Sequence, residues 1–305
     1  MSIGKAYCCW LRRIAVVSLW LLGVAHAAHG RPGLGVRAYS LGQAYRSIAT
    51  DGEAVLYNPA GLVCMPRFAM QGNYAFSFDG PIHDAGIMLV DSKTIPLAVG
   101  LSYFFDAEPR QFFDEHTFAH LAILSLAYPI VSRNLGLGVN LSYRNLPKPD
   151  GSGAWNKVSL DVGLTMRFSR LFSLAAVGYN LIPTRLERVP MGVGLGLSSV
   201  VLAHREERTP LGVYNGLTLA IDWALHGLLY ADSPENNLSV GAEYLLLMLV
   251  PLRAGYEVTF ALKKTHRMNF GTGIAMGNLG LDLLYGFVIG DIGDSIIGFS
   301  LQFAT

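Results

Sequence analysis

From about residue 67 to the end of the chain, apolar and polar residues alternate, and this period of two is typical of β-strands with one apolar face. In KVSLDVGLTMRF at 157–168, every second residue from Val158 to Phe168 is apolar, while Lys, Ser, Asp, Gly, Thr and Arg lie between them. LGLGVNLSYR at 135–144 repeats the pattern. The alternation predicts about fourteen strands, which start near residues 67, 82, 95, 117, 135, 157, 171, 190, 213, 237, 251, 267, 279 and 294.

The length and number of these strands are those of a membrane barrel. Each has roughly 9–12 residues, enough for a tilted strand to cross a bilayer, and even numbers predominate in single-chain outer-membrane barrels. In such barrels both termini and the short turns lie on the periplasmic side. DSKT at 91–94 and VSRN at 131–134 are short, whereas NLPKPDGSGAWN at 145–156 and GLLYADSPENN at 227–237 are long, as this rule requires. VLAHREERTPLG at 201–212 breaks the rule, which indicates either a long turn or a shift of register.

The second face of the strands distinguishes a membrane barrel from a soluble β-protein. The polar face of a soluble sandwich meets water and carries many Lys and Glu residues, but here it is mostly Gly, Ser, Ala, Asn and Thr. Such a face suits a narrow lumen, and a closed barrel pairs every backbone N–H and C=O inside a bilayer. We therefore predict an all-β fold, a transmembrane antiparallel β-barrel of about fourteen strands over residues 67–305. A soluble β-sandwich is the alternative.

The composition limits the classes of structure and partner. Apolar residues make up 51% of the 305 residues and charged residues only 15%, with a mean hydropathy of +0.37. Nevertheless, after the N-terminal segment no apolar run approaches the roughly 18–20 residues that a spanning helix needs. The formal net charge of +1 argues against nucleic acid as a partner.

The first 27 residues have the features of a signal peptide. A positively charged stretch up to Arg13 precedes an apolar core at 14–24, and Ala25-His26-Ala27 supplies a small-x-small cleavage pattern. Cleavage near Ala27 predicts export. Together with the predicted barrel, it indicates the outer membrane of a two-membrane bacterium, with outer-membrane lipid and the barrel-assembly machinery as partners. An uncleaved membrane anchor is the alternative. Cleavage would leave Cys64 as the only cysteine, so no intramolecular disulfide is expected.

Residues 28–66 do not alternate, and we expect them to fold as a separate N-terminal hatch or plug. The stretch RAYSLGQAYRSIATDGEAVLYNPAGL at 37–62 indicates two short helical pieces with a break at Asp51-Gly52 between them. A Pro-Gly turn follows, since Pro59 fixes φ and Gly61 permits a tight reversal. The apolar content favours burial in the lumen over a segment that hangs in the periplasm. An ordinary helix-terminating loop is the alternative interpretation of the turn.

The same stretch carries a family resemblance. The pattern R-A-x-x-L-G-x-A-Y-x-x-x-A-x-D-x-x-A-V-x-Y-N-P-A-G-L at 37–62 resembles the N-terminal segment of FadL-type outer-membrane transporters and of the related PorV/PorQ-type barrels. Those families are fourteen-stranded barrels with an N-terminal hatch that carries an Asn-Pro-Ala motif. The rest of the chain is similar to them only in strand pattern and approximate length. The resemblance implies that the hatch and gating residues are Asp51, Ala54, Tyr57, Asn58, Pro59, Ala60 and Gly61.

The resemblance also implies a function. It implies an outer-membrane channel for passive uptake of hydrophobic small molecules, such as long-chain fatty acids, with a hatch that rearranges around residues 51–62. The alternatives are a PorV-like role with a secretion-system partner and a structural barrel whose lumen stays closed. The chain departs from the transporters in its shorter length and more compact external loops. Phe112 and Phe113 in the predicted loop at 106–116 are the candidates for external apolar capture.

Ionisable residues on the lumen face are the remaining candidate site. They could brace the hatch or contact the headgroup of a ligand, and they are Arg144, Asp161, Arg167, Asp222, Glu243, Arg253 and Glu257. We expect Asp161 near Arg144, and Glu243 near Arg253 and Glu257.

Catalytic chemistry is not indicated by the sequence. We find no convincing GxSxG motif, phosphate loop or CxxC pair, so the chain is not expected to be an enzyme or to hold a cofactor. His116 and His120 have the spacing of a helical zinc pair. On one strand, however, they would lie about 13 Å apart, too far to share a metal ion.

Overall fold

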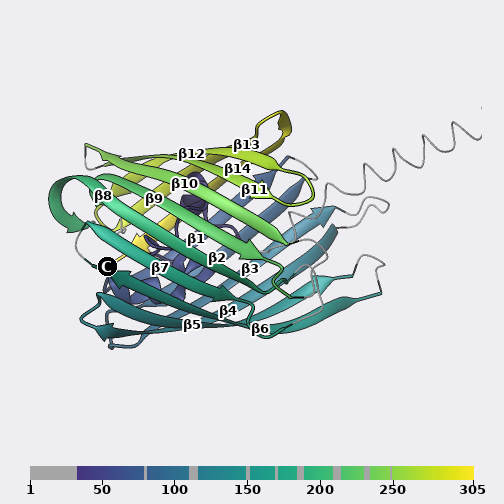
Figure 1. The fold of residues 1–305 in the computed structure, drawn as a ribbon, viewed down its shortest axis with the longest axis horizontal. Helices are drawn as coiled ribbons and strands as arrows, with labels where there is room; N and C mark the ends of the chain where they lie inside the picture. The colour runs from purple at the N-terminus through teal and green to yellow at the C-terminus, as the bar shows by residue number, and fades with distance from the viewer. Residues whose placement is uncertain are drawn as a thin grey trace, which may run out of the picture. The chain divides into compact units, whose positions relative to one another are not determined.

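The computed structural model describes residues 33–78, 81–109, 116–148, 152–168, 171–183, 189–208, 214–229, 234–247 and 249–305. Within them the chain forms a closed barrel of fourteen antiparallel strands, preceded by a short helical segment (Figure 1). The predicted signal peptide at 1–27 and the residues Phe112 and Phe113 lie outside the described residues. No helix in the described ranges is long and apolar enough to cross a membrane.

The observed strands coincide with the predicted ones. They are β1 Phe68–Ser77, β2 Ile82–Asp91, β3 Ala98–Pro109, β4 His116–Val131, β5 Leu135–Pro147, β6 Ala154–Arg167, β7 Phe172–Tyr179, β8 Gly192–Arg208, β9 Tyr214–His226, β10 Glu235–Leu246, β11 Val250–Phe260, β12 Thr265–Met276, β13 Leu279–Val288 and β14 Asp291–Ala304. Each strand starts within about three residues of its predicted position. The period of two therefore located every strand of the barrel.

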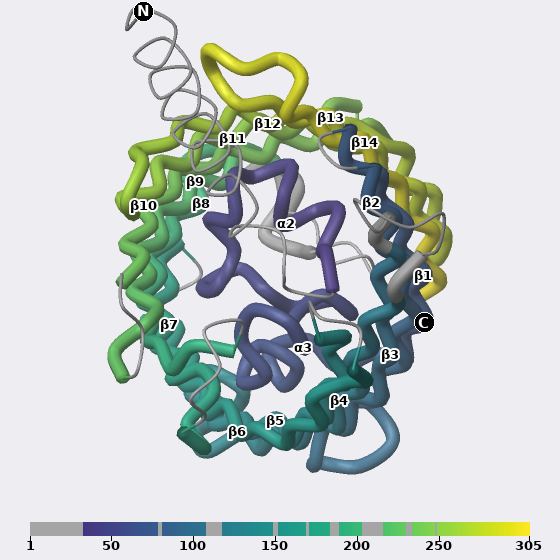
Figure 2. The backbone as a smooth tube through the Cα atoms, turned by 90° about the vertical axis from the view of Figure 1, so that its right-hand side faces the viewer, coloured from purple at the N-terminus to yellow at the C-terminus, as the bar shows by residue number. Residues whose placement is uncertain are grey.

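The sheet closes on itself through its first and last strands. Every strand pairs with its neighbours in sequence, and β1 pairs with β14 from Ala69 opposite Ala304 to Ser77 opposite Ile296. The N–H of Thr305 also donates to the carbonyl of Phe68 at 2.9 Å, so the C-terminus lies beside the start of β1. Figure 2 shows the resulting ring of strands. Closure leaves no free sheet edge, and a soluble β-sandwich is therefore the wrong alternative.

The outer and inner faces of the barrel wall differ in polarity, as the sequence predicts. On β5 and β6, Leu141 and Val158 point outward and are 48% and 49% exposed, whereas Asn140 and Ser159 point inward and are buried. Large apolar side chains cover the outside around the whole ring. An apolar outer face with small and polar residues inside is the arrangement of a membrane-spanning barrel.

The exception at 201–212 is mostly strand. β8 continues to Arg208 and remains paired with β9, with irregularities between Val200 and Leu202 and between Ala203 and Arg208. A bulge adds residues to one strand without moving its partner, so β8 can lengthen while the rest of the barrel keeps its register. Of the two alternatives for this segment, a long turn or a shift of register, the structure shows the shift of register.

The segment ahead of β1 folds inside the barrel, and we call residues 33–66 the plug. It contains α2 Val36–Ser40, α3 Ala54–Tyr57 and the 3-10 helix η1 Pro59–Cys64, all of which lie within the ring in Figure 2. α2 contacts β11 to β14, and η1 contacts β3 to β6 on the other side. Nearly all plug side chains are buried, so the segment does not hang outside the barrel.

Glycines on the inner wall leave room for the plug backbone. A Cβ atom at Gly138 of β5 would overlap the backbone of Pro59 and Ala60, and one at Gly255 of β11 would overlap that of Leu41. Because the plug lies directly on the wall at both points, the small-residue face of the strands is a packing surface.

Gly138→Ala is expected to lower the free energy of unfolding by about 1–3 kcal/mol, because it overpacks the contact between β5 and η1. Gly72→Ala is the matched control, since a Cβ atom at Gly72 would lie 4.0 Å from its nearest neighbour. Urea unfolding of both variants in lipid vesicles measures the difference. Equal stability of the two variants would contradict the close packing of η1 against β5.

Candidate functional site

The candidate site is the interface between the plug and the barrel wall, where Arg37 of α2 is the centre of a buried ionic network. Arg37 Nε and Nη2 donate to the two carboxylate oxygens of Glu243 on β10 at 2.8 and 2.7 Å, and Nη1 donates to Asp51 at 2.9 Å. On the wall, Arg253 donates to Glu243 and to Asp282, each at 2.6 Å. Glu243 therefore joins a cation of the plug to a cation of the wall.

A second ionic contact holds the chain between α2 and α3. Asp222 Oδ2 on β9 accepts hydrogen bonds from the backbone N–H groups of Tyr45 and Arg46 at 2.9 and 2.8 Å. It also accepts one from Arg46 Nη1 at 3.1 Å. Arg46 Nε donates to the hydroxyl of Tyr179 on β7, which donates in turn to the carbonyl of Tyr57 at 2.6 Å. This part of the plug is thus tied to β7 and β9.

Glu53 connects the start of α3 to α2 and to β1. Its carboxylate accepts from the backbone N–H groups of Arg37 and Ala38 at 3.1 and 2.9 Å and from Gln71 Nε2 at 3.0 Å. Burial raises the pKa of Glu53 to about 8, and the charge of Asp51 acts in the same direction, while the two backbone N–H groups lower it. Glu53 is therefore a buried acid that is fully hydrogen-bonded within the plug interface.

The Asn-Pro-Ala motif attaches the second half of the plug to β5 and β6. Asn58 Oδ1 accepts from the N–H of Ala60 at 3.1 Å and caps η1. Asn58 Nδ2 donates to the carbonyl of Arg46 at 3.0 Å and to Thr165 Oγ1 on β6 at 2.7 Å. Pro59 occupies the first position of η1, where a missing N–H costs nothing. The motif thus begins η1 and also attaches it to the barrel wall at β6.

The other predicted hatch residues also lie buried in the plug. A Cβ atom at Gly61 would overlap the carbonyl of Ala49, so only glycine fits there. Tyr57 packs edge-on against Tyr45 with ring centroids 5.5 Å apart, and Ala54 is fully buried in α3. All seven predicted hatch residues are therefore part of one packed interface.

The predicted lumen residues divide by what they contact. Asp222, Glu243 and Arg253 belong to the networks above. Glu257 on β11 accepts from Gln43 Nε2 at 3.0 Å, and Arg167 on β6 donates to the carbonyl of Cys64 at 3.2 Å. Most of this set therefore touches the plug.

Asp161 does not pair with Arg144, contrary to the expectation from the sequence. It accepts from the backbone N–H of Asn180 at 2.8 Å and from Asn140 Nδ2 at 3.3 Å. The register explains the difference, because Asp161 lies opposite Asn140 while Arg144 lies opposite Lys157.

Sequence reasoning missed the charged residues of the plug itself, which are Arg37, Arg46 and Glu53. A signal was present, because all three lie within a segment that was expected to be buried in the lumen. A buried charge needs a partner, so the two arginines predict carboxylates or other acceptors around them, and Glu53 predicts a cation or several hydrogen-bond donors.

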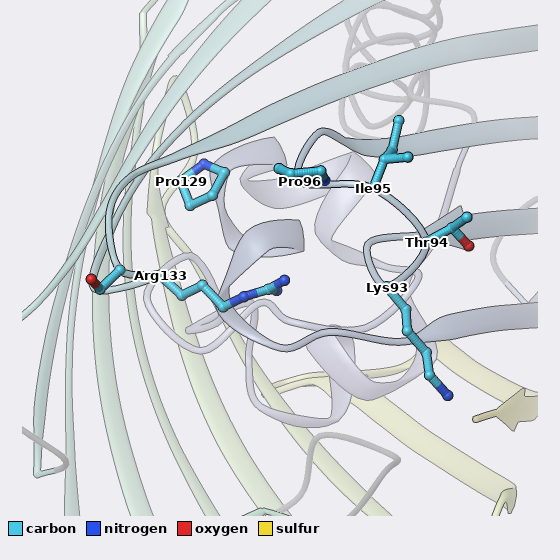
Figure 3. Close-up of a pocket in the computed structure, with 7 residues that line it drawn as sticks. Lys93, Thr94, Ile95, Pro96, Pro129 and Arg133 are labelled. Carbon is cyan, nitrogen blue, oxygen red and sulfur yellow. The ribbon is translucent and has the colours of Figure 1, made fainter.

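A pocket of about 360 Å³ opens near the end of η1. It is formed by the turns between β2 and β3 and between β4 and β5, and its lining residues are Lys93, Thr94, Ile95, Pro96, Pro129, Ser132 and Arg133 (Figure 3). These turns lie at the same end of the barrel as the start of β1 and the C-terminus. Arg133 extends from its turn toward the plug and donates to the carbonyl of Val63 at 3.1 Å.

Glu243→Gln and Arg37→Gln are each expected to weaken the seating of the plug by about 3 kcal/mol, because either change breaks a buried ion pair. The double variant should cost less than the sum of the two single variants, since both changes remove the same contact. Urea unfolding and ion conductance in planar bilayers measure stability and leakage, with the exposed Asp291→Asn as control. Additive losses would show that the two residues do not interact.

Comparisons with known proteins relate this fold to characterised barrels. No protein-family model matches the chain, and no curated protein matches it in sequence. Solved structures do match. They include the CymD monoaromatic hydrocarbon channel, with a TM-score of 0.61 at 13% identity over 90% of this chain and 97% of that one. A Pseudomonas aeruginosa FadL homologue has a TM-score of 0.61 at 13% identity over 90% and 98% of the two chains.

The toluene transporter TodX of Pseudomonas putida is a third match, with a TM-score of 0.57 at 14% identity over 90% of this chain and 98% of that chain. The matches span nearly the whole of each relative. Identities this low show the fold alone. The chain therefore has the fold of the FadL-type outer-membrane barrels.

Proposed function

We propose that this protein is an outer-membrane channel for the passive uptake of hydrophobic small molecules, with long-chain fatty acids as the expected cargo. Its apolar outer face places the barrel in a bilayer, and the plug controls the lumen. A ligand would enter from outside and pass when the plug rearranges around residues 51–62.

The observation that carries the proposal is how the plug is attached. Among the described residues, no backbone–backbone hydrogen bond joins the plug to a strand. The contacts are side-chain bonds such as those of Arg37, Asn58 and Asp222, together with packing on glycines. Such contacts can break and re-form without opening the strand ladder, so the plug can move while the barrel stays closed.

The structural neighbours support a channel for hydrophobic compounds. Those compared above are described as a monoaromatic hydrocarbon channel, a toluene transporter and a FadL homologue. Fatty acids as cargo follow from the resemblance of residues 37–62 to the hatch of FadL-type transporters.

Asn58→Ala is expected to change uptake of hexadecanoate at least threefold, because it removes the cap of η1 and the bond to Thr165 while leaving the strands unchanged. The test compares cells that display equal amounts of folded protein, with Asn278→Ala in an exposed turn as the matched control. Uptake that is the same in wild type, Asn58→Ala and a plug deletion would reject the proposal.

Native mass spectrometry of the gently extracted protein separates this function from the alternatives. A bound hydrophobic small molecule supports uptake. A stoichiometric protein partner would instead favour the secretion-linked role predicted from the PorV-type resemblance.

A further inference from the structure

Three arginines from separate elements converge on the last residues of the plug. Arg133 Nη1 donates to the carbonyl of Val63 at 3.1 Å, and Arg167 Nη1 donates to the carbonyl of Cys64 at 3.2 Å. Arg67, which directly precedes β1, donates to the sulfur of Met65 at 2.8 Å. We call Arg67, Arg133 and Arg167 the arginine cluster.

Within the described residues, no carboxylate forms an ion pair with this cluster. Its acceptors are carbonyls and a thioether, which are neutral, and no carboxylate lies within 4.0 Å of the three guanidinium groups in the described ranges. Arg37, Arg46, Arg253 and Arg267 each have a carboxylate partner by the same measure. The cluster therefore differs from these four arginines, each of which is paired with a carboxylate.

Unused donors accompany the unpaired charge. Arg67 is only 1% exposed, and its Nε and Nη1 atoms have no hydrogen-bond partner among the described residues; the same is true of Nε and Nη2 of Arg167. Burial lowers the pKa of Arg67 to about 10, so its guanidinium remains charged at neutral pH. The nearby Asp51 is already bonded to Arg37. A buried cation with free donors is costly unless an anion satisfies it.

The pocket in Figure 3 borders this cluster at Arg133. Arg133 lines the pocket and also bonds the plug, and Lys93 adds a second positive charge on the opposite rim. Ile95, Pro96 and Pro129 supply apolar surface between them. Arginine pairs well with carboxylates because its planar donors match both oxygens. A molecule with one anionic group and an apolar body fits this combination.

We propose that the arginine cluster is a binding site for the carboxylate of an amphiphilic ligand at the end of the barrel that holds the C-terminus. This inference rests on the proposed uptake function and adds a preference for acids over neutral hydrocarbons. The carboxylate accepts hydrogen bonds from the free donors of Arg67 and Arg167, and it competes with the carbonyls of Val63 and Cys64 for Arg133 and Arg167. Because those carbonyls belong to the end of η1, binding favours a state in which the end of the plug has moved.

The test compares binding of hexadecanoate and hexadecan-1-ol, which share a chain length and differ in the headgroup, to the amphipol-stabilised protein. Wild type is expected to bind the acid about tenfold more tightly than the alcohol, as a hydrogen bond to a charged group predicts. Arg67→Gln and Arg167→Gln should lose this preference while their affinity for the alcohol stays unchanged. Arg167→Lys keeps the positive charge and should retain part of the preference for the acid.

Two controls keep the result interpretable. Lys264→Gln removes one positive charge near the β11–β12 turn, at the opposite end of the barrel, and should bind both probes as wild type does. Arg133→Gln changes a half-buried turn residue, so it reports on the cluster even if Arg67→Gln fails to fold. A preference for the acid that survives in all folded variants would overturn the inference but leave the uptake function standing. If wild type binds neither probe, the uptake function itself fails.

Discussion

The ion pair between Arg37 and Glu243 is the contact on which the rest of the structure depends. A charge inside a narrow lumen has little water to solvate it, so a charged plug is stable only where the wall carries the complementary charges. Glu243 meets that demand twice, with Arg37 from the plug and Arg253 from β11. Asp222 on β9 is likewise the wall partner of Arg46 in the plug. Glu243, Asp222 and Arg253 thus form part of the wall surface that binds the plug.

The same constraint explains the chemistry of the inner face. A backbone can approach a wall closely only where side chains are small, and Gly138 and Gly255 lie where the plug backbone meets the strands. Asn58 then bonds the plug to Thr165 beside one of these contacts. An alternating sequence whose inward-facing residues are small and polar therefore specifies both the barrel and the surface against which the plug packs. The plug is bound by side chains and packing, which makes it the element that can move.

Much of this architecture could be predicted from the sequence, because the barrel obeys a local rule. Alternation located all fourteen strands, since the in–out pattern depends only on neighbouring residues. Pairings across the lumen depend on register and on the path of the plug, which alternation does not specify. Asp161 was therefore matched wrongly with Arg144, and Arg37 was missed as the partner of Glu243. The bulges that extend β8 are also invisible to a strict period of two.

Hydrogen–deuterium exchange of the folded protein in lipid tests the central claim most directly. The claim is that the helical part of the plug, residues 36–64, is held inside the barrel by buried polar contacts. It predicts that their amides exchange at least a hundredfold more slowly than those of an unstructured peptide, because they are buried and bonded within the lumen. Rapid exchange of residues 36–64 beside fully protected strands would contradict it.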